Sequence, residues 1–227
     1  TGTSLSAANQ SGQEVDFSKL LKDAVTLLEG GGDAWTESDD VRDRLLQGYE
    51  YILVDEYQDI DEQQYALVSA LAGRRRSDPD AKLSIMAVGD DDQNIYSFKG
   101  ANVEFIRRFQ KDYGGEVTYL VENFRSTQNI IAAANHIIQR GPDRMKVDHP
   151  IRINDARAKD PPGGRWSTLD SVTQGRVKLV SAPVDRNLQA QLVLDEIQRL
   201  MTVEPRLALS DVAVLARTHR VLEPVRA

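Results

Sequence analysis

The chain has 227 residues, of which 41% are hydrophobic and 28% are charged, and this composition is ordinary for a globular protein. It contains no cysteine, which excludes disulfides and thiolate metal sites and is compatible with a reducing cytoplasm. No apolar run approaches the roughly 20 residues needed to span a bilayer, so no membrane partner is expected. The net charge of −7 argues against binding nucleic acid through phosphate contacts alone.

The N-terminal region predicts an irregular start followed by a helix. Residues 1–13 are rich in Ser, Gly, Ala and Gln and are predicted to be disordered or a linker. Asp16 is predicted to cap an amphipathic helix over 17–28. The glycine triplet at 30–32 is interpreted as the stop of this helix, because no strand precedes it and no Lys follows it as in a phosphate loop. A short helix is predicted over 40–47.

Further along the chain, short apolar strands alternate with helices. The predicted strands are 51–54, 83–88, 117–121, 176–181 and 212–215. The predicted helices follow Asp61 and Asn102, ending near 73 and 113, and cover 127–140 behind a Ser126 cap, 185–201, and the segment after Thr218. This alternation with short connections predicts an α/β fold with a parallel sheet. The segment 141–175 is rich in Pro, Gly and charge and is predicted to be mostly loop.

Two adjacent carboxylates follow the first predicted strand. Asp55 and Glu56 come directly after four residues suited to a buried strand of a parallel sheet. Ligands of open α/β sheets bind at the carboxyl ends of the strands. Two carboxylates there can hold Mg²⁺ and orient a water for nucleotide hydrolysis, although a solvated strand end is the plainer alternative. No Gly-x-x-x-x-Gly-Lys-Ser/Thr sequence occurs, so no phosphate cradle is encoded.

A second polar cluster follows the strand at 83–88. Gln93 offers a neutral amide that can hydrogen-bond a phosphate and a water together. Tyr96, Phe98 and Lys99 combine aromatic rings with a cation, which is typical of a base-stacking platform, or they are core residues. The three Asp residues at 90–92 lack the spacing of a calcium loop.

A third cluster follows the strand at 117–121. Phe124 can stack on a nucleobase, and Arg125 can stabilise charge on a transferring phosphoryl group as an arginine finger. Taken alone, an Arg near a helix N-terminus is more often a surface ion-pair partner.

Together the clusters resemble the motifs of one enzyme family. The runs VDEYQD (54–59), GDDDQNIYSFKGA (89–101) and LVENFRST (120–127) are similar, in the same order, to motifs II, III and IV of the UvrD/Rep/PcrA family of superfamily 1 DNA helicases. The run VAVLAR (212–217) is similar to the later motif IVa.

The resemblance implies a role for each matched residue. Asp55 would bind Mg²⁺, Glu56 would activate water, and Gln93 would sense the γ-phosphate. Phe124 would stack on adenine, and Arg125 would reach the γ-phosphate from the second motor domain. The residues implied to contact DNA are Tyr96, Phe98, Lys99 and Arg217. Many relatives have Trp at the place of Phe98, Arg at that of Lys99 and Tyr at that of Phe124.

The resemblance also implies a fold and a domain plan. It covers residues 14–227, most weakly across 141–175, and implies parts of two RecA-like (P-loop NTPase) domains with parallel sheets flanked by helices. The C-terminal part of the first would occupy 14–113 and the N-terminal part of the second 114–227. Because the chain lacks an initiator Met and is predicted to stop in mid-helix, we expect a piece of a longer polypeptide, inactive alone without its Walker A loop.

The function implied for the longer polypeptide is an ATP-dependent DNA helicase. It would hydrolyse ATP with Mg²⁺ to move along single-stranded DNA, 3′ to 5′ as in most relatives, and unwind duplex DNA in repair, replication or recombination. Its partners would be DNA and the remaining helicase domains, in a bacterial cytoplasm or nucleoid. Two alternatives stay open: a RecB- or AddA-like subunit of a helicase–nuclease, or a non-catalytic remnant acting as a DNA-binding or interaction module.

Overall fold

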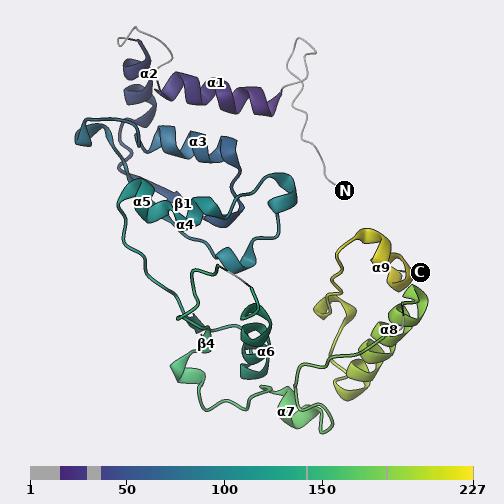
Figure 1. Ribbon diagram of the computed structural model, residues 1–227. Helices are drawn as coiled ribbons and strands as arrows, with labels where there is room; N and C mark the ends of the chain where they lie inside the picture. The colour runs from purple at the N-terminus through teal and green to yellow at the C-terminus, as the bar shows by residue number, and fades with distance from the viewer. Residues whose placement is uncertain (1–15, 30–36, 142, 183, 227) are drawn as a thin grey trace. The chain divides into compact units, whose positions relative to one another are not determined.

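The computed structural model of the chain describes residues 16–29, 37–141, 143–182 and 184–226 (Figure 1). The chain divides into two compact units. Unit 1 comprises Thr1–Thr118 and Asp143–Met145, and unit 2 comprises Tyr119–Pro142 and Lys146–Ala227. The features predicted at 1–13 and 30–32 lie outside the described residues. Within the described ranges, no helix combines the length and the apolar character needed to cross a membrane.

Unit 1 is an α/β arrangement whose elements largely match the predicted ones. In chain order they are α1 (Phe17–Glu29), α2 (Glu37–Leu46), β1 (Tyr51–Val54), η1 (Tyr57–Asp59), α3 (Glu62–Leu71), η2 (Pro79–Ala81), β2 (Ser84–Ala87), η3 (Asp91–Gln93), η4 (Ser97–Lys99), α4 (Glu104–Arg107) and α5 (Phe109–Tyr113). Helices α1 and α3 lie side by side (Figure 1). Two predicted caps are confirmed: Asp16 accepts from the amides of Ser18 and Lys19, and Asp61 forms a capping box with Gln64.

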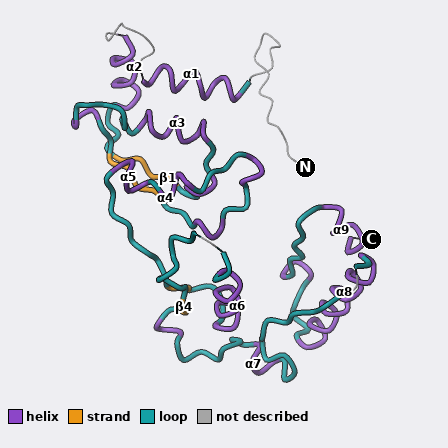
Figure 2. The backbone as a smooth tube through the Cα atoms, viewed as in Figure 1, coloured by secondary structure: helices purple, strands orange, loops and turns teal. Residues whose placement is uncertain are grey.

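Strands β1 and β2 pair in parallel, with Tyr51 opposite Ser84 and Val54 opposite Ala87 (Figure 2). The expectation of fully covered strands is wrong for both, because exposed and half-buried side chains alternate along each one. Leu53, for example, is 75% exposed, whereas its neighbour Val54 packs on the core. Successive side chains point to opposite faces of a sheet, so the described part of unit 1 covers one face and leaves the other open.

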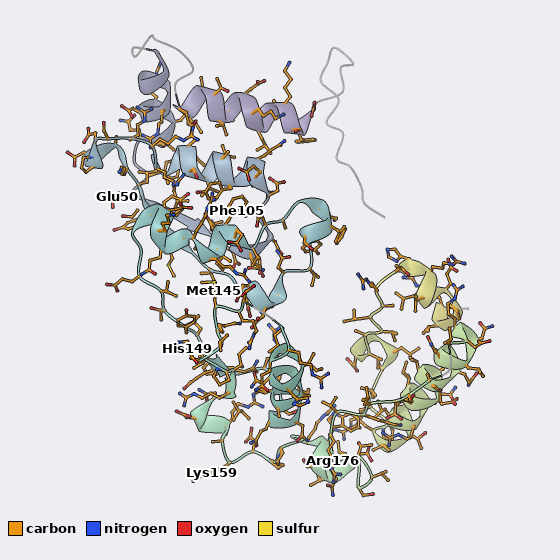
Figure 3. The ribbon with its side chains drawn as sticks, viewed as in Figure 1. Glu50, Phe105, Met145, His149, Lys159 and Arg176 are labelled. Atoms are coloured by element: carbon orange, nitrogen blue, oxygen red, sulfur yellow. The ribbon has the colours of Figure 1, made fainter. Side chains whose placement is uncertain are left out.

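The core of unit 1 lies where the strand ends meet α3 and α4. Its buried members are Tyr57, Ile60, Tyr65 and Phe105. The rings of Tyr65 and Phe105 stack with centroids 4.2 Å apart, and Figure 3 shows Phe105 in this part of the molecule. The helix predicted through 113 is interrupted at Arg108. Its N-cap is Val103, one residue after the predicted Asn102, whose side-chain oxygen accepts the Glu104 amide at 3.0 Å. This core fixes the loops that follow β1 and β2.

A buried carboxylate ties α5 to α3. Asp112 accepts hydrogen bonds from the Tyr65 hydroxyl at 2.6 Å, from Arg74 at 2.8 Å and from Arg108 at 2.9 Å. Burial acts to raise the pKa of Asp112, but the Tyr65 hydrogen bond and the two guanidinium charges outweigh it and lower the pKa. The carboxylate therefore stays charged and anchors the C-terminal end of the unit.

Unit 2 contains a second small parallel sheet and four helices among its described residues. The elements are β3 (Glu122–Asn123), α6 (Gln128–Ile138), β4 (Arg152–Ile153), η5 (Asp155–Arg157), α7 (Trp166–Leu169), α8 (Arg186–Val203), η6 (Leu209–Asp211) and α9 (His219–Arg226). Strand β3 pairs with β4 in parallel, with Glu122 opposite Arg152. The segment 141–175 is mostly loop with short elements, as predicted.

Three predicted strands are absent, one at the boundary between the units and two in unit 2. The segments 117–121, 176–181 and 212–215 have no strand in the structure, and β3 begins one residue after the first of them. A strand needs a hydrogen-bonded neighbour, and an apolar run alone does not supply one. Leu179 and Leu215, at 98% and 91% exposed, show that the apolar side chains at these two positions are not buried by the described residues.

Candidate functional site

The acidic pair stands at the carboxyl end of β1, where the backbone changes direction. Asp55 and Glu56 are both exposed, and one carboxylate oxygen of Asp55 accepts the Glu56 amide at 2.9 Å. Glu56 has φ 50° and ψ 42°, in the left-handed region that residues other than glycine seldom adopt. The turn leads directly into η1, so the two neighbouring carboxylates face different surroundings.

Gln93 lies in the turn that follows β2, next to the loop that carries Glu56. The two strand ends are joined by a hydrogen bond of 3.0 Å from the Tyr57 amide to the Val88 carbonyl. Asp90 caps η3 by accepting the Asp92 amide, and its second oxygen accepts the Gln93 side-chain amide at 2.7 Å. The structure therefore brings Glu56 and Gln93 onto adjoining loops of one unit.

Two residues to which sequence reasoning gave no role hold these loops: Gln58 connects them to each other, and Arg144 ties the second to the segment Asp143–Met145. Gln58 is buried between them, with hydrogen bonds to both. Arg144, from the segment that returns to unit 1, donates to both carboxylate oxygens of Asp92 at 2.8 and 2.7 Å. The Asp92 hydrogen bond raises the pKa of Arg144 above its ordinary value. No local pattern identifies either residue, because their partners are 32 and 52 residues away.

The acidic triplet at 90–92 is engaged by protein groups. Its carboxylate oxygens lie within 4.8 Å of one another, a spacing that could suit a metal ion. Arg144 pairs with Asp92, however, and the Met145 amide donates to Asp91 at 2.8 Å. Arg107 stands 4.0 Å from Asp91 as a second cation. These contacts give the triplet a structural explanation as the anchor of the segment Asp143–Met145.

The aromatic cluster of the second motif lies on an exposed loop. The ring centroids of Tyr96 and Phe98 are 6.2 Å apart, and the Lys99 ammonium lies 5.2 Å from the first and 5.7 Å from the second. Phe98 is 77% exposed, so the core alternative is wrong for this residue. An exposed pair of rings with a cation beside them can receive a nucleobase.

In unit 2, the third cluster is held by the side chain of Asn123. Its oxygen accepts the amides of Arg125 and Ser126, at 3.0 and 2.7 Å, and shapes the turn after β3. The cap predicted at Ser126 is wrong: Thr127 is the N-cap of α6, and its side chain forms no cap hydrogen bond. Phe124 is 69% exposed and Arg125 is exposed, so both side chains are available to a ligand. Arg217 is exposed on the stretch before α9.

Two family models together match almost the whole chain, each over one of these site-bearing regions. The UvrD/REP helicase N-terminal domain matches residues 3–114, and the UvrD-like helicase C-terminal domain matches residues 118–225. The chain belongs to the UvrD/REP helicase family. The domains of these UvrD-like helicases are RecA-like, which agrees with the mixed α/β fold and the small parallel sheets.

Curated relatives of this UvrD-like chain carry helicase names. It is 34% identical over 218 residues to the ATP-dependent DNA helicase PcrA of Leuconostoc citreum, covering 96% of this chain and 25% of that protein. It is 39% identical over 132 residues to DNA helicase II of Escherichia coli, covering 58% and 16%. It is 32% identical over 213 residues to the ATP-dependent DNA helicase UvrD1 of Mycobacterium leprae, covering 91% and 24%. The chain thus spans a quarter or less of the length of these relatives.

Proposed function

We propose that this chain supplies part of the motor of an ATP-dependent DNA helicase, and that ATP hydrolysis drives movement along single-stranded DNA and unwinding of duplex DNA. The observation that carries the proposal is the juxtaposition of Glu56 and Gln93 at neighbouring strand ends. A carboxylate and a neutral amide on adjoining loops suit the activation of a water next to a phosphate. The family and the names of its curated members support the same activity.

On the nucleotide side, Asp55 fits the role of a Mg²⁺ ligand. Asp55 is exposed at the strand end. Within the described residues, its carboxylate accepts one hydrogen bond, from the Glu56 amide, and this bond uses one of the two oxygens. Carboxylate oxygen is the ligand that Mg²⁺ prefers, and the bound ion would neutralise charge on the phosphates. Glu56 would take a proton from the attacking water, and Gln93 would contact the γ-phosphate.

The residues of unit 2 would complete the nucleotide site. Phe124 offers an exposed ring for adenine, and Arg125 an exposed guanidinium for the γ-phosphate. In this proposal, ATP joins the two units and its hydrolysis releases them. The assignments of 14–113 to a first RecA-like domain and of 114–227 to a second follow from this division of roles.

On the DNA side, Tyr96 and Phe98 would stack on bases while Lys99 and Arg217 contact the backbone. Base stacking contributes about 1–3 kcal/mol per base and depends little on sequence. It also suits a chain with a net charge of −7, which is poorly matched to phosphate binding alone. We further propose 3′-to-5′ movement, as the resemblance implies. A bacterial cytoplasmic or nucleoid setting is proposed because the curated relatives named above are bacterial.

The test uses the complete polypeptide that contains this chain. We expect ATP hydrolysis stimulated by single-stranded DNA and unwinding of a duplex with a 3′ tail. Glu56→Gln should lower the rate of hydrolysis at least 100-fold and retain DNA binding, because only proton transfer is removed. The isolated 227-residue chain, which has no Gly-Lys-Ser/Thr loop, should hydrolyse negligible ATP. Unwinding by Glu56→Gln at the wild-type rate would contradict the proposed base.

A further inference from the structure

Gln58 is one of the most deeply buried polar residues in the described part of the chain, and it lies two residues after Glu56. It is 1% exposed, in η1. Its side-chain nitrogen donates to one carboxylate oxygen of Glu56 at 2.7 Å, and its side-chain oxygen accepts the Asp90 amide at 3.0 Å. The same nitrogen lies 3.4 Å from Asp59. A buried side-chain amide normally forms hydrogen bonds with other buried groups. The Gln58 amide instead donates its shortest hydrogen bond to the carboxylate of an exposed residue.

Beyond Gln58, the hydrogen bonds continue to Gln93. The Asp90 amide donates to Gln58, and the Asp90 carboxylate accepts the Gln93 side-chain amide at 2.7 Å. A further hydrogen bond joins the same two loops, because the Asn94 side-chain amide donates to the Gln58 backbone carbonyl at 2.6 Å. One continuous path of hydrogen bonds, Glu56–Gln58–Asp90–Gln93, therefore links the two predicted catalytic side chains within unit 1.

Gly89 lies close to the Gln58 side chain where the two strand ends approach. A Cβ atom built on Gly89 would lie 2.7 Å from the Gln58 side-chain oxygen and 3.2 Å from the Tyr57 nitrogen. A side chain at position 89 would press on the Gln58 side chain, so glycine allows the two strand ends to approach with the amide between them. At the Glu56 end of the path, the left-handed backbone conformation gives the side chain a direction that differs from that in a regular strand or helix.

These contacts select which carboxylate oxygen of Glu56 can act. A general base must present a free oxygen within hydrogen-bond reach of its water. Gln58 donates to one oxygen, which leaves the other oxygen of this exposed residue available to a water. We propose that Gln58 is a positioning residue of the ATPase site, which orients the Glu56 carboxylate and couples its orientation to Gln93. This inference rests on the proposed function, because it assigns Glu56 the role of base.

The test replaces Gln58 with Glu in the complete polypeptide. Gln58→Glu keeps the shape and the acceptor for the Asp90 amide but removes the donor to Glu56 and adds a like charge. We expect kcat for DNA-stimulated ATP hydrolysis to fall about 10- to 100-fold, with KM for ATP and the affinity for a single-stranded oligonucleotide within twofold of wild type. Gln110→Glu, the same change at an exposed position of α5, is the control and should leave all three unchanged.

A second variant guards against misfolding of the first. Gln58→Asn retains the amide but withdraws it by one carbon, so it should show a smaller loss of kcat with the same unchanged KM. Two outcomes would overturn the inference: a wild-type kcat in both variants, or a parallel loss of kcat, nucleotide affinity and thermal stability. In either case, an active wild-type polypeptide would still support the proposed function. A wild-type polypeptide that hydrolyses no ATP would overturn the proposed function itself, and the inference with it.

Discussion

At the scale of single residues, the end of β1 shows how two adjacent carboxylates acquire different surroundings. Alternation along a strand predicts that Asp55 and Glu56 point apart. Strand β1 ends at Val54, however, and Glu56 adopts a left-handed backbone conformation, at a cost of about 1–2 kcal/mol for a residue with a Cβ atom. The sequence could not predict the part played by Gln58, because a Gln has no local signature and its partner Asp90 is 32 residues away.

The exposed ring of Phe98 leads to a prediction about DNA binding. In the complete polypeptide, Phe98→Ala should weaken binding of single-stranded DNA by about 1–3 kcal/mol, because one stacking surface is lost. Fluorescence anisotropy with a labelled oligothymidylate measures the change. Ile95→Ala, at an exposed apolar position of the same loop, is the control. An equal loss in both variants would show that the loop, rather than the aromatic ring, binds DNA.

At the scale of elements, helices were predictable from sequence and several strands were not. Helix signals are local: Asp61 and Asp185 cap α3 and α8 with side-chain hydrogen bonds to amides two or three residues on. Strand signals are not, because pairing depends on distant residues. The runs at 176–181 and 212–215 have suitable residues and no strand, whereas β4 forms inside a segment predicted to be loop.

An ionic network on α8 determines how unit 2 should respond to acid. Arg199 pairs with Glu196 and with the nearly buried Asp170, while Lys178 donates to Glu196 at 2.8 Å. The Arg199 hydrogen bond, helped by Lys178 and opposed by burial, lowers the pKa of Glu196 from 4.5 to about 2. A lowered pKa in the folded state stabilises the fold above pH 4.5, and this contribution disappears as the pH falls towards 2.

Comparison of the 227-residue chain with its Glu196→Gln variant measures this contribution. Urea unfolding followed by circular dichroism should show a wild-type advantage in unfolding free energy that is constant above about pH 5 and shrinks towards zero near pH 2. Asp195→Asn, at the neighbouring exposed position of the same helix, is the control and should lack this dependence. A wild-type advantage that is independent of pH would contradict the network.

At the scale of the whole molecule, the predicted nucleotide residues are divided between the two units. Asp55, Glu56 and Gln93 belong to unit 1, and Phe124 and Arg125 belong to unit 2. The resemblance to the helicase motifs implies that the first set belongs to one RecA-like domain and the second set to another. The central claim of our account is that one ATP molecule brings the two sets of side chains together.

The most direct test measures the distance between the units with and without nucleotide. The chain contains no cysteine, so Lys111→Cys on α5 and His136→Cys on α6 introduce its only two thiols, once any cysteines elsewhere in the complete polypeptide are replaced. Pulsed electron paramagnetic resonance of attached spin labels then gives the distance distribution. We predict that a non-hydrolysable ATP analogue with Mg²⁺ shifts it to one narrower population, and that Arg125→Ala abolishes the shift. An unchanged distribution in a polypeptide that demonstrably binds the analogue would contradict the account.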